Sequence, residues 1–213
     1  MNISASEEKL IPKKHLSTPM TDVMLLWDTP ILFEKLFQEH DIKCTRVLSN
    51  AIGTPFLPPC KCLMIPTGFA NTAYTKIISG IERNKDTIEE FVKKGGIVAV
   101  FGPMISEHDY EWLPMDLKYT QKHETVNIHI VEEHGAQSII QDIDQAVECD
   151  GYFSETKEKV LIENSYGKPV MVAKQLGEGM IIATTIHEFP SPEFLKWLCS
   201  GKKKIKLSIY KKT

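Results

Sequence analysis

A histidine and a glutamate near the end of the chain are the leading candidates for acid–base chemistry. His187 and Glu188 follow an apolar stretch and precede the turn Phe189-Pro190. A histidine in this position can act as a base or bind the carboxylate of a ligand, although capping the turn would also account for it. We therefore take His187 and Glu188 as candidate catalytic residues.

Further candidates follow the apolar runs of the first half of the chain. Asp28 ends the first run, where acidic residues often bind ligand hydroxyls or amines, although it could simply start the next helix. Backbone amides around Gly68 could hold a carboxylate, although the need for a tight turn also explains this glycine. The expected ligand-binding residues are Asp28, Thr67, Gly68, Asn71, Gly102 and Pro103.

Three other groups give weaker signals. Asp150-Gly151 is typical of a turn before a strand. Cys149 is a candidate thiol, but it follows an expected apolar helix and has no neighbouring histidine. Cys60-Lys61-Cys62 has no second pair of ligands at the spacing of a zinc site. We therefore expect no metal and no cofactor.

Composition limits the classes of partner. The chain has 213 residues, of which 42% are hydrophobic and 25% are charged, with a net charge of -3. This balance gives no electrostatic reason to expect nucleic acid or an anionic membrane. A small-molecule ligand or a partner protein is favoured, and a homo-oligomer is possible. The five cysteines show no paired spacing, which favours reduced thiols and a cytoplasmic location.

The first half of the chain alternates between strand and helix patterns. Continuous apolar runs, typical of strands covered on both faces, predict strands at residues 23–27, 62–66 and 97–101, and a further strand is expected at residues 43–48. Thr29 as N-cap and Pro30 at the first helical position predict a helix that continues to about residue 40. Further helices are expected at residues 72–79 and 85–93. Parallel neighbours need such crossover connections, so a parallel sheet follows.

The second half has more strands and fewer helices. Strands are expected at residues 125–131, 151–153, 160–162, 170–173 and 180–185, with helices at 137–147 and 192–199 and a last edge strand within 202–210. The overall expectation is an α/β protein: a three-layer, doubly wound, mostly parallel sheet with helices on both faces and an added β-meander in the C-terminal half. Residues 1–21 would form a flexible arm, 22–200 a single domain and 201–213 a lysine-rich tail or edge strand.

Three segments resemble class I glutamine amidotransferase-like proteins, which have a flavodoxin-like α/β fold. Residues 63–69 resemble the strand and turn that supply an oxyanion-hole amide, and residues 88–102 resemble the helix and strand that lead to the nucleophile. Residues 177–188 resemble the late hairpin that ends at the catalytic histidine. The resemblance implies the same fold, with His187 at the position of the triad histidine.

The chain departs from this family at the nucleophile. The resemblance puts Gly102 of Val100-Phe101-Gly102-Pro103-Met104 where the family has its cysteine. Glycine cannot attack an amide, and Pro103 has no N–H to bind an oxyanion. Loss of one oxyanion donor alone costs about 100- to 1,000-fold in rate. Phe189 stands where the family has its triad carboxylate, so we expect no glutaminase activity.

Three functions remain open from the sequence. The first is a non-catalytic amidotransferase-like protein that binds a small molecule or has a regulatory role. The second is a hydrolase with non-cysteine chemistry, in which His187 works with Asp28 or Glu188. The third is a protein-interaction or oligomerisation module that uses the aromatic segment 110–119 and the lysine-rich end.

Overall fold

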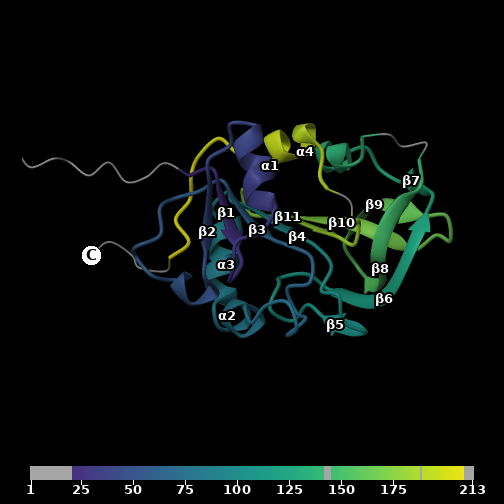
Figure 1. Cartoon of the computed structure of the whole chain (residues 1–213), viewed down its shortest axis with the longest axis horizontal. Helices are drawn as coiled ribbons and strands as arrows, with labels where there is room; N and C mark the ends of the chain where they lie inside the picture. Colours follow the sequence, from purple (N-terminus) through teal and green to yellow (C-terminus); the bar gives the residue numbers. More distant parts are fainter. Residues whose placement is uncertain (1–20, 142–144, 188, 209–213) are drawn as a thin grey trace, which may run out of the picture.

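A computed structural model describes residues 21–141, 145–187 and 189–208. The expected arm at residues 1–21 lies, except for Thr21, outside the described residues, as do Glu188 and residues 209–213. The protein has an α/β fold with one large and one small sheet (Figure 1). The helices and 3-10 turns are α1 (Phe33–Glu39), η1 (Ser49–Ala51), α2 (Ile78–Arg83), α3 (Lys85–Lys93), η2 (Gly135–Ile139) and α4 (Pro192–Leu198).

The large sheet has eight strands in the order β2-β1-β3-β4-β11-β10-β9-β7. Its first five strands are parallel, and β11, β10, β9 and β7 are successively antiparallel. The strands are β1 (Val23–Leu26), β2 (Cys44–Val47), β3 (Cys62–Ile65), β4 (Ile97–Val100), β7 (Ile128–Ile130), β9 (Lys159–Asn164), β10 (Pro169–Leu176) and β11 (Gly179–Thr184). The expected C-terminal meander therefore corresponds to β9, β10 and β11.

Helices cover both faces of the parallel part of the large sheet (Figure 1). Along β1, alternate side chains enter two different cores, because successive side chains of a strand point to opposite faces. Met24 and Leu26 join the core that contains Phe91 of α3, whereas Val23 and Leu25 join the core that contains Phe37 of α1. This double burial explains why β1, β3 and β4 are continuous apolar runs, as expected.

The small sheet is antiparallel, in the order β5-β6-β8, and lies beyond the end of the parallel strands (Figure 1). Its strands are β5 (Glu107–Asp109), β6 (Leu117–Val126) and β8 (Val147–Thr156). The expected single strand at residues 125–131 is wrong: it is divided at Asn127 between β6 in the small sheet and β7 in the large sheet. A period-two pattern identifies extended backbone but not the sheet that it joins.

The helix expectations were only partly correct. Helix α3 occupies the expected residues 85–93 and is followed by Gly95 at φ 109°. Helix α4 begins where expected, because the Ser191 side chain accepts a hydrogen bond from Phe194 N. The expected cap at Thr29 is wrong: α1 begins at Phe33, after Leu32, which makes no side-chain cap.

Three further expectations need correction. Residues 72–74 form a turn, residues 75–77 are irregular and α2 begins only at Ile78. The Asp28 side chain accepts hydrogen bonds from Thr75 Oγ1 and Lys76 N and so fixes the irregular backbone there. Of the helix expected at residues 137–147, the described residues form only the end of η2, since Ile140 has an extended backbone and β8 starts at Val147. Where a last strand was expected, the described residues 202–208 contain one isolated bridge, between Ile205 and Cys60.

An aromatic cluster joins the small sheet to the loop after β3. The His108 ring lies 5.3 Å from Phe69 and 4.8 Å from Tyr110, measured between centroids. Its Nε2 atom accepts a hydrogen bond from Trp112 Nε1 at 3.4 Å, which requires this nitrogen to be unprotonated. Burial lowers the pKa of His108 to about 4, and the nearby Asp109 opposes the shift only partly.

This cluster predicts a specific loss of stability in acid. A histidine whose folded pKa is below its unfolded value stabilises the fold above the unfolded pKa, and this contribution is lost as the pH falls through the folded pKa. Between pH 6.5 and pH 4, we expect His108 to account for a loss of about 1–2 kcal/mol, discounted for its partial exposure. Urea unfolding of the wild type and His108→Phe at pH 7 and pH 4 measures this; equal losses in both proteins would contradict it.

Candidate functional site

The loops after β3 and β4 meet at the carboxyl edge of the parallel strands. Gly68 N donates a hydrogen bond to Gly102 O at 2.8 Å, and Asn71 Nδ2 donates to Met104 O at 2.9 Å. Met104 has φ 52°, a left-handed conformation that is uncommon for a residue with a side chain. Such strain is often found at functional sites, so this edge is the first place to examine.

The space beside Gly102 is filled by a carboxylate. A Cβ atom added at Gly102 would lie 2.1 Å from Asp150 Oδ2 and 2.4 Å from Asp150 Cγ. Such distances are far inside van der Waals contact, so no side chain fits at position 102 while Asp150 keeps its place. Asp150 therefore occupies the position that a nucleophilic side chain on residue 102 would need.

Strand β8 brings Asp150 to this position. Asp150 N donates to Thr185 O at 2.9 Å and His187 N donates to Glu148 O at 2.8 Å, with a bridge between Cys149 and Ile186. This short antiparallel pairing joins the small sheet to the residues that follow β11. Because side chains alternate along a strand, Cys149 and Ile186 enter the core while their neighbours point to the other face.

Asp150 and His187 form the centre of the site. His187 Nδ1 lies 3.9 Å from Asp150 Oδ2, and Tyr119 OH lies 3.2 Å from Asp150 Oδ1 while also donating to the Asp150 carbonyl at 2.8 Å. The Asp150 side chain is 1% exposed and that of His187 is 33% exposed. Burial raises the pKa of Asp150, and His187 and Tyr119 partly offset this. Within the described parts of the chain, no hydrogen-bond donor reaches Asp150 Oδ2.

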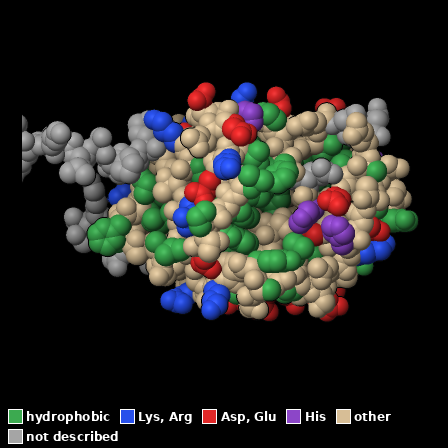
Figure 2. Space-filling model, viewed as in Figure 1, with side chains coloured by type: hydrophobic (Ala, Val, Ile, Leu, Met, Phe, Trp, Pro, Cys, Tyr) green, Lys and Arg blue, Asp and Glu red, His purple; other side chains and the backbone are tan. Residues whose placement is uncertain are grey.

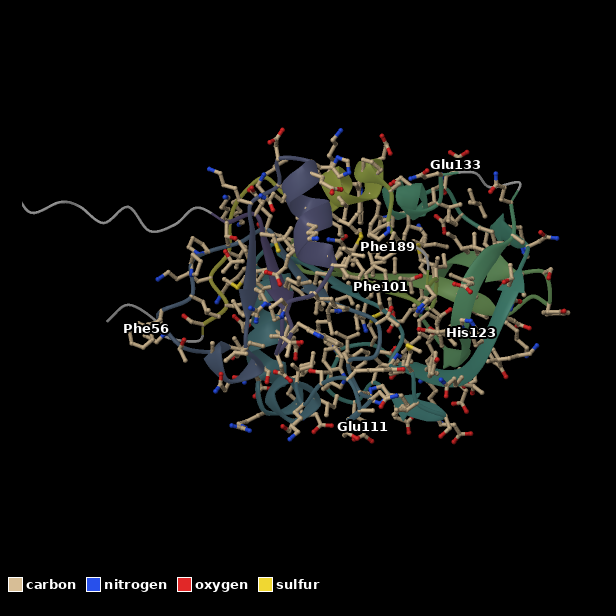
Figure 3. All side chains as sticks on the ribbon, in the orientation of Figure 1. Phe56, Phe101, Glu111, His123, Glu133 and Phe189 are labelled. Atoms are coloured by element: carbon tan, nitrogen blue, oxygen red, sulfur yellow. The ribbon has the colours of Figure 1, made fainter. Side chains whose placement is uncertain are left out.

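A second histidine and a second carboxylate lie beside this pair. The ring centroid of His123 is 5.9 Å from that of His187, and His123 Nε2 is 3.5 Å from Glu148 Oε1. Figure 2 shows neighbouring histidine side chains at the surface, next to acidic and hydrophobic side chains. Figure 3 places His123 on the small sheet, across from Phe101 and Phe189. Phe189 is 58% exposed, and its ring centroid lies 6.2 Å from that of Phe33. These rings provide apolar surface on the side of the cluster where Figure 3 labels Phe101 and Phe189.

The candidates from the first half of the chain mostly hold the loops together. Asp28 binds Thr75 Oγ1 and Lys76 N, both at 2.7 Å, and so fastens the segment before α2. The amides of Gly68 and Asn71 donate to the carbonyls of Gly102 and Gly68, so in this conformation they are not offered to a carboxylate. Ligand binding by either loop therefore remains a prediction.

Gly102 and Pro103 are the candidates that lie nearest to the new cluster. Both are buried at the end of β4, whereas Thr67 is half-buried in the facing loop. Of the two candidate catalytic residues, His187 lies in the cluster and Glu188 lies outside the described residues. The sequence therefore identified His187, which is one member of the cluster, and Gly102, against which the Asp150 carboxyl group packs.

Sequence reasoning missed the carboxylate that His187 contacts. Asp150-Gly151 was interpreted as a turn, but both residues lie inside β8, where Asp150 is buried. Cys149 is likewise in β8 rather than after a helix, and burial makes it part of the core. The sequence does contain a signal for this strand: the apolar residues Val147, Cys149 and Phe153 all stand at odd-numbered positions, as expected for a period of two. Tyr119, His123 and Glu148 gave no local signal of a site.

The described residues do not suggest a metal site or a membrane span. Among them, no group of three or more histidine, cysteine, aspartate or glutamate side chains has the geometry to hold a metal ion. No helix in the described ranges is long and apolar enough to cross a membrane.

Comparisons with known proteins bear on the fold alone. No protein-family model matches the chain, and no curated protein is significantly similar to it. Cytoplasmic Protein STM3548 from Salmonella typhimurium is similar in structure, with a TM-score of 0.50 and 9% identity over 85% of this chain and 100% of that one. Cytoplasmic Protein STM1381 from the same species gives 0.49 and 12% identity, over 84% and 94% of the two chains.

A longer protein is also structurally similar. The β-galactosidase from Bacillus circulans sp. alkalophilus gives a TM-score of 0.44 and 12% identity over 83% of this chain. The chain spans only 30% of the length of that enzyme.

The contact between Gly102 and Asp150 predicts coupled effects of substitution. Gly102→Ala should destabilise the protein by about 1–3 kcal/mol, because the added methyl group overlaps a buried carboxylate. In the Asp150→Ala background the same change should cost much less, since the overlapping atoms are gone. Chemical denaturation of the four proteins gives the coupling energy. Gly201→Ala is the control, because there the nearest atom to the added Cβ is Lys61 Cβ at 3.8 Å; additive effects at 102 and 150 would contradict the packing.

The raised pKa of Asp150 predicts a pH-dependent gain in stability for Asp150→Asn. An acid with a raised folded pKa binds its proton more tightly in the folded state, so its contribution is lost as pH rises from about 3.8 through the folded value. Asparagine keeps an acceptor for Tyr119 without this titration. The variant should therefore gain stability relative to the wild type between pH 4 and pH 7, measured by urea unfolding. If the difference in unfolding free energy between the variant and the wild type stays constant from pH 4 to pH 7, the raised pKa of Asp150 is contradicted.

Proposed function

We propose that this protein is a class I glutamine amidotransferase-like domain, with a three-layer, doubly wound, flavodoxin-like fold, that has lost amidotransferase chemistry and binds a small molecule. The strand order β2-β1-β3-β4-β11 supports the proposal, because flavodoxin-like sheets have the order 2-1-3-4-5. The glycine turn after β3 and the histidine after β11 lie at the same edge of this sheet, where such folds bind ligands. The five cysteines, none of which is in a disulfide, favour a cytoplasmic location.

The observation that carries the loss of activity is the Asp150 carboxylate against Gly102. Acyl transfer to a cysteine requires a thiolate beside a base and amide donors for the oxyanion. Here the space for a side chain at position 102 holds Asp150, and residue 103 is a proline without an N–H. The Gly68 amide is also engaged with Gly102 O. A nucleophile and two oxyanion donors would all have to be restored for glutaminase activity.

The same pair supports a binding role. Asp150 lies behind His187, and an imidazole close to a buried carboxylate favours orientations that turn one ring nitrogen toward it, which leaves the other nitrogen for a ligand. His187 is partly exposed while Asp150 behind it is buried, so a ligand can reach the imidazole but not the carboxylate. The exposed ring of Phe189 adds apolar surface at the rim.

A second candidate function is hydrolysis by an activated water molecule. It is favoured by the Asp150–His187 pair, since a carboxylate behind a histidine orients it as a general base. Asp28 is less favoured for this part, because its Oδ2 atom already accepts hydrogen bonds from Thr75 and Lys76. In this reading the base would be His187 and the residue that orients it would be Asp150. Turnover of simple esters or amides that is lost in His187→Ala would favour hydrolysis over binding alone.

The binding proposal predicts ligand-induced stabilisation without glutamine hydrolysis. Purified protein should release no ammonia from glutamine above background. In a thermal-shift screen of amides, amino acids, sugars and organic acids, at least one class should raise the melting temperature, and His187→Ala and Asp150→Asn should abolish this rise. A ligand at 100 times its Kd adds about 2.7 kcal/mol of stability, a shift that is readily measured.

His129→Ala is the matched control for this screen. His129 is also a histidine paired with a carboxylate, at 3.2 Å from Glu163, but it lies on β7 away from the cluster. Its removal should leave the ligand effect intact. Ammonia release at enzyme-like rates, or ligand effects that are insensitive to both site variants, would disprove the proposal.

A further inference from the structure

His123 is placed beside His187 by an irregularity in the small sheet. Gln121 of β6 pairs with Gly151 of β8, and Glu124 pairs with Cys149. Two residues, Lys122 and His123, therefore lie opposite the single residue Asp150, which is the arrangement of a β-bulge. Bulges re-aim side chains and are frequent next to functional sites. This one turns His123 toward the cluster, where its ring is nearly perpendicular to that of His187, at 86°.

The cluster consists of two histidine–carboxylate pairs side by side. His187 Nδ1 faces the buried Asp150, and His123 Nε2 faces the half-exposed Glu148. A carboxylate beside one ring nitrogen favours ring orientations that direct the other nitrogen away from it. The 5.9 Å between ring centroids is short enough for one small group to contact both rings.

We propose that His123 and His187 together bind one oxyanion group, a phosphate or a carboxylate, of a small-molecule ligand. The inference rests on the proposed binding function and adds its ligand chemistry and its second residue. An oxyanion has several acceptor oxygens and can accept one hydrogen bond from a ring N–H of each imidazole. The ligand would contact His187 through Nε2 and His123 through Nδ1, the nitrogens opposite those that face the carboxylates.

The neighbouring lysine does not share this role. Lys122 Nζ lies 2.6 Å from Glu124 Oε2 and 4.9 Å above the ring centroid of Tyr166, so it is held away from the histidines. General attraction between a positive surface and an anion would involve Lys122 as much as His123. Lys122→Ala therefore separates a specific two-histidine site from diffuse charge.

The test is titration of the full chain with inorganic phosphate and with acetate, followed by NMR of the imidazole resonances and by calorimetry. Phosphate, acetate or both should shift the resonances of both His123 and His187 with one dissociation constant. His123→Ala and His187→Ala should each weaken that binding about tenfold or more, the usual effect of losing one charge-assisted hydrogen bond. Lys122→Ala and His129→Ala should bind like the wild type. Tighter binding of phosphate would assign a phosphate ligand, and tighter binding of acetate a carboxylate.

Four results would overturn the inference. They are shifts of His187 alone, equal affinity in His123→Ala and the wild type, equal weakening in Lys122→Ala and His123→Ala, and absence of binding by either anion. None of these four results decides the proposed function, because the binding of a neutral ligand found in the thermal-shift screen could still depend on His187 and Asp150. Glutamine hydrolysis would instead disprove the proposed function without a phosphate titration. Circular dichroism of each variant shows whether a loss of binding reflects a loss of fold.

Discussion

The close contact between the Asp150 carboxyl group and the backbone of Gly102 is the constraint on which the site depends. A buried carboxylate with one oxygen lacking a hydrogen bond from the described residues is unfavourable, since its desolvation is not fully compensated. Tyr119 supplies part of the compensation and His187 another part. Perturbed buried groups of this kind are concentrated at functional sites, which is why the candidate site is placed here rather than at Asp28, whose Oδ2 atom accepts two hydrogen bonds.

The site also depends on the way in which the two sheets are joined. Strand β8 belongs to the small sheet but pairs, at Cys149, with Ile186 beyond the end of β11. That bridge brings Asp150 and His187 into one cluster although they are far apart in the sequence. The bulge in β6 adds His123. The parallel sheet thus supplies the floor of the site through Gly102. The antiparallel sheet supplies most of its ionisable side chains.

Sequence reasoning succeeded where the physical signal is local. The strands β1, β3 and β4 are buried on both faces and so appear as apolar runs, and α3 has a clear glycine stop. It failed where tertiary contacts decide the structure: Asp28 delays α2 through long-range hydrogen bonds, and Asn127 separates strands of two sheets. His187 could be identified from its position after an apolar strand. Asp150 could not, because its partner is set by strand pairing rather than by spacing along the chain.

Gly102 can be understood as a steric requirement of Asp150. Any side chain at position 102 would displace the carboxylate, so glycine there is the condition for the Asp150–His187 pair to form. Conversely, a thiol introduced at position 102 would overlap the Asp150 carboxyl group. A substitution at position 102 alone therefore leaves no room for a nucleophilic side chain. The two positions exclude one another sterically, and under the proposed function it is this exclusion that leaves His187 to interact with a ligand rather than with a thiol.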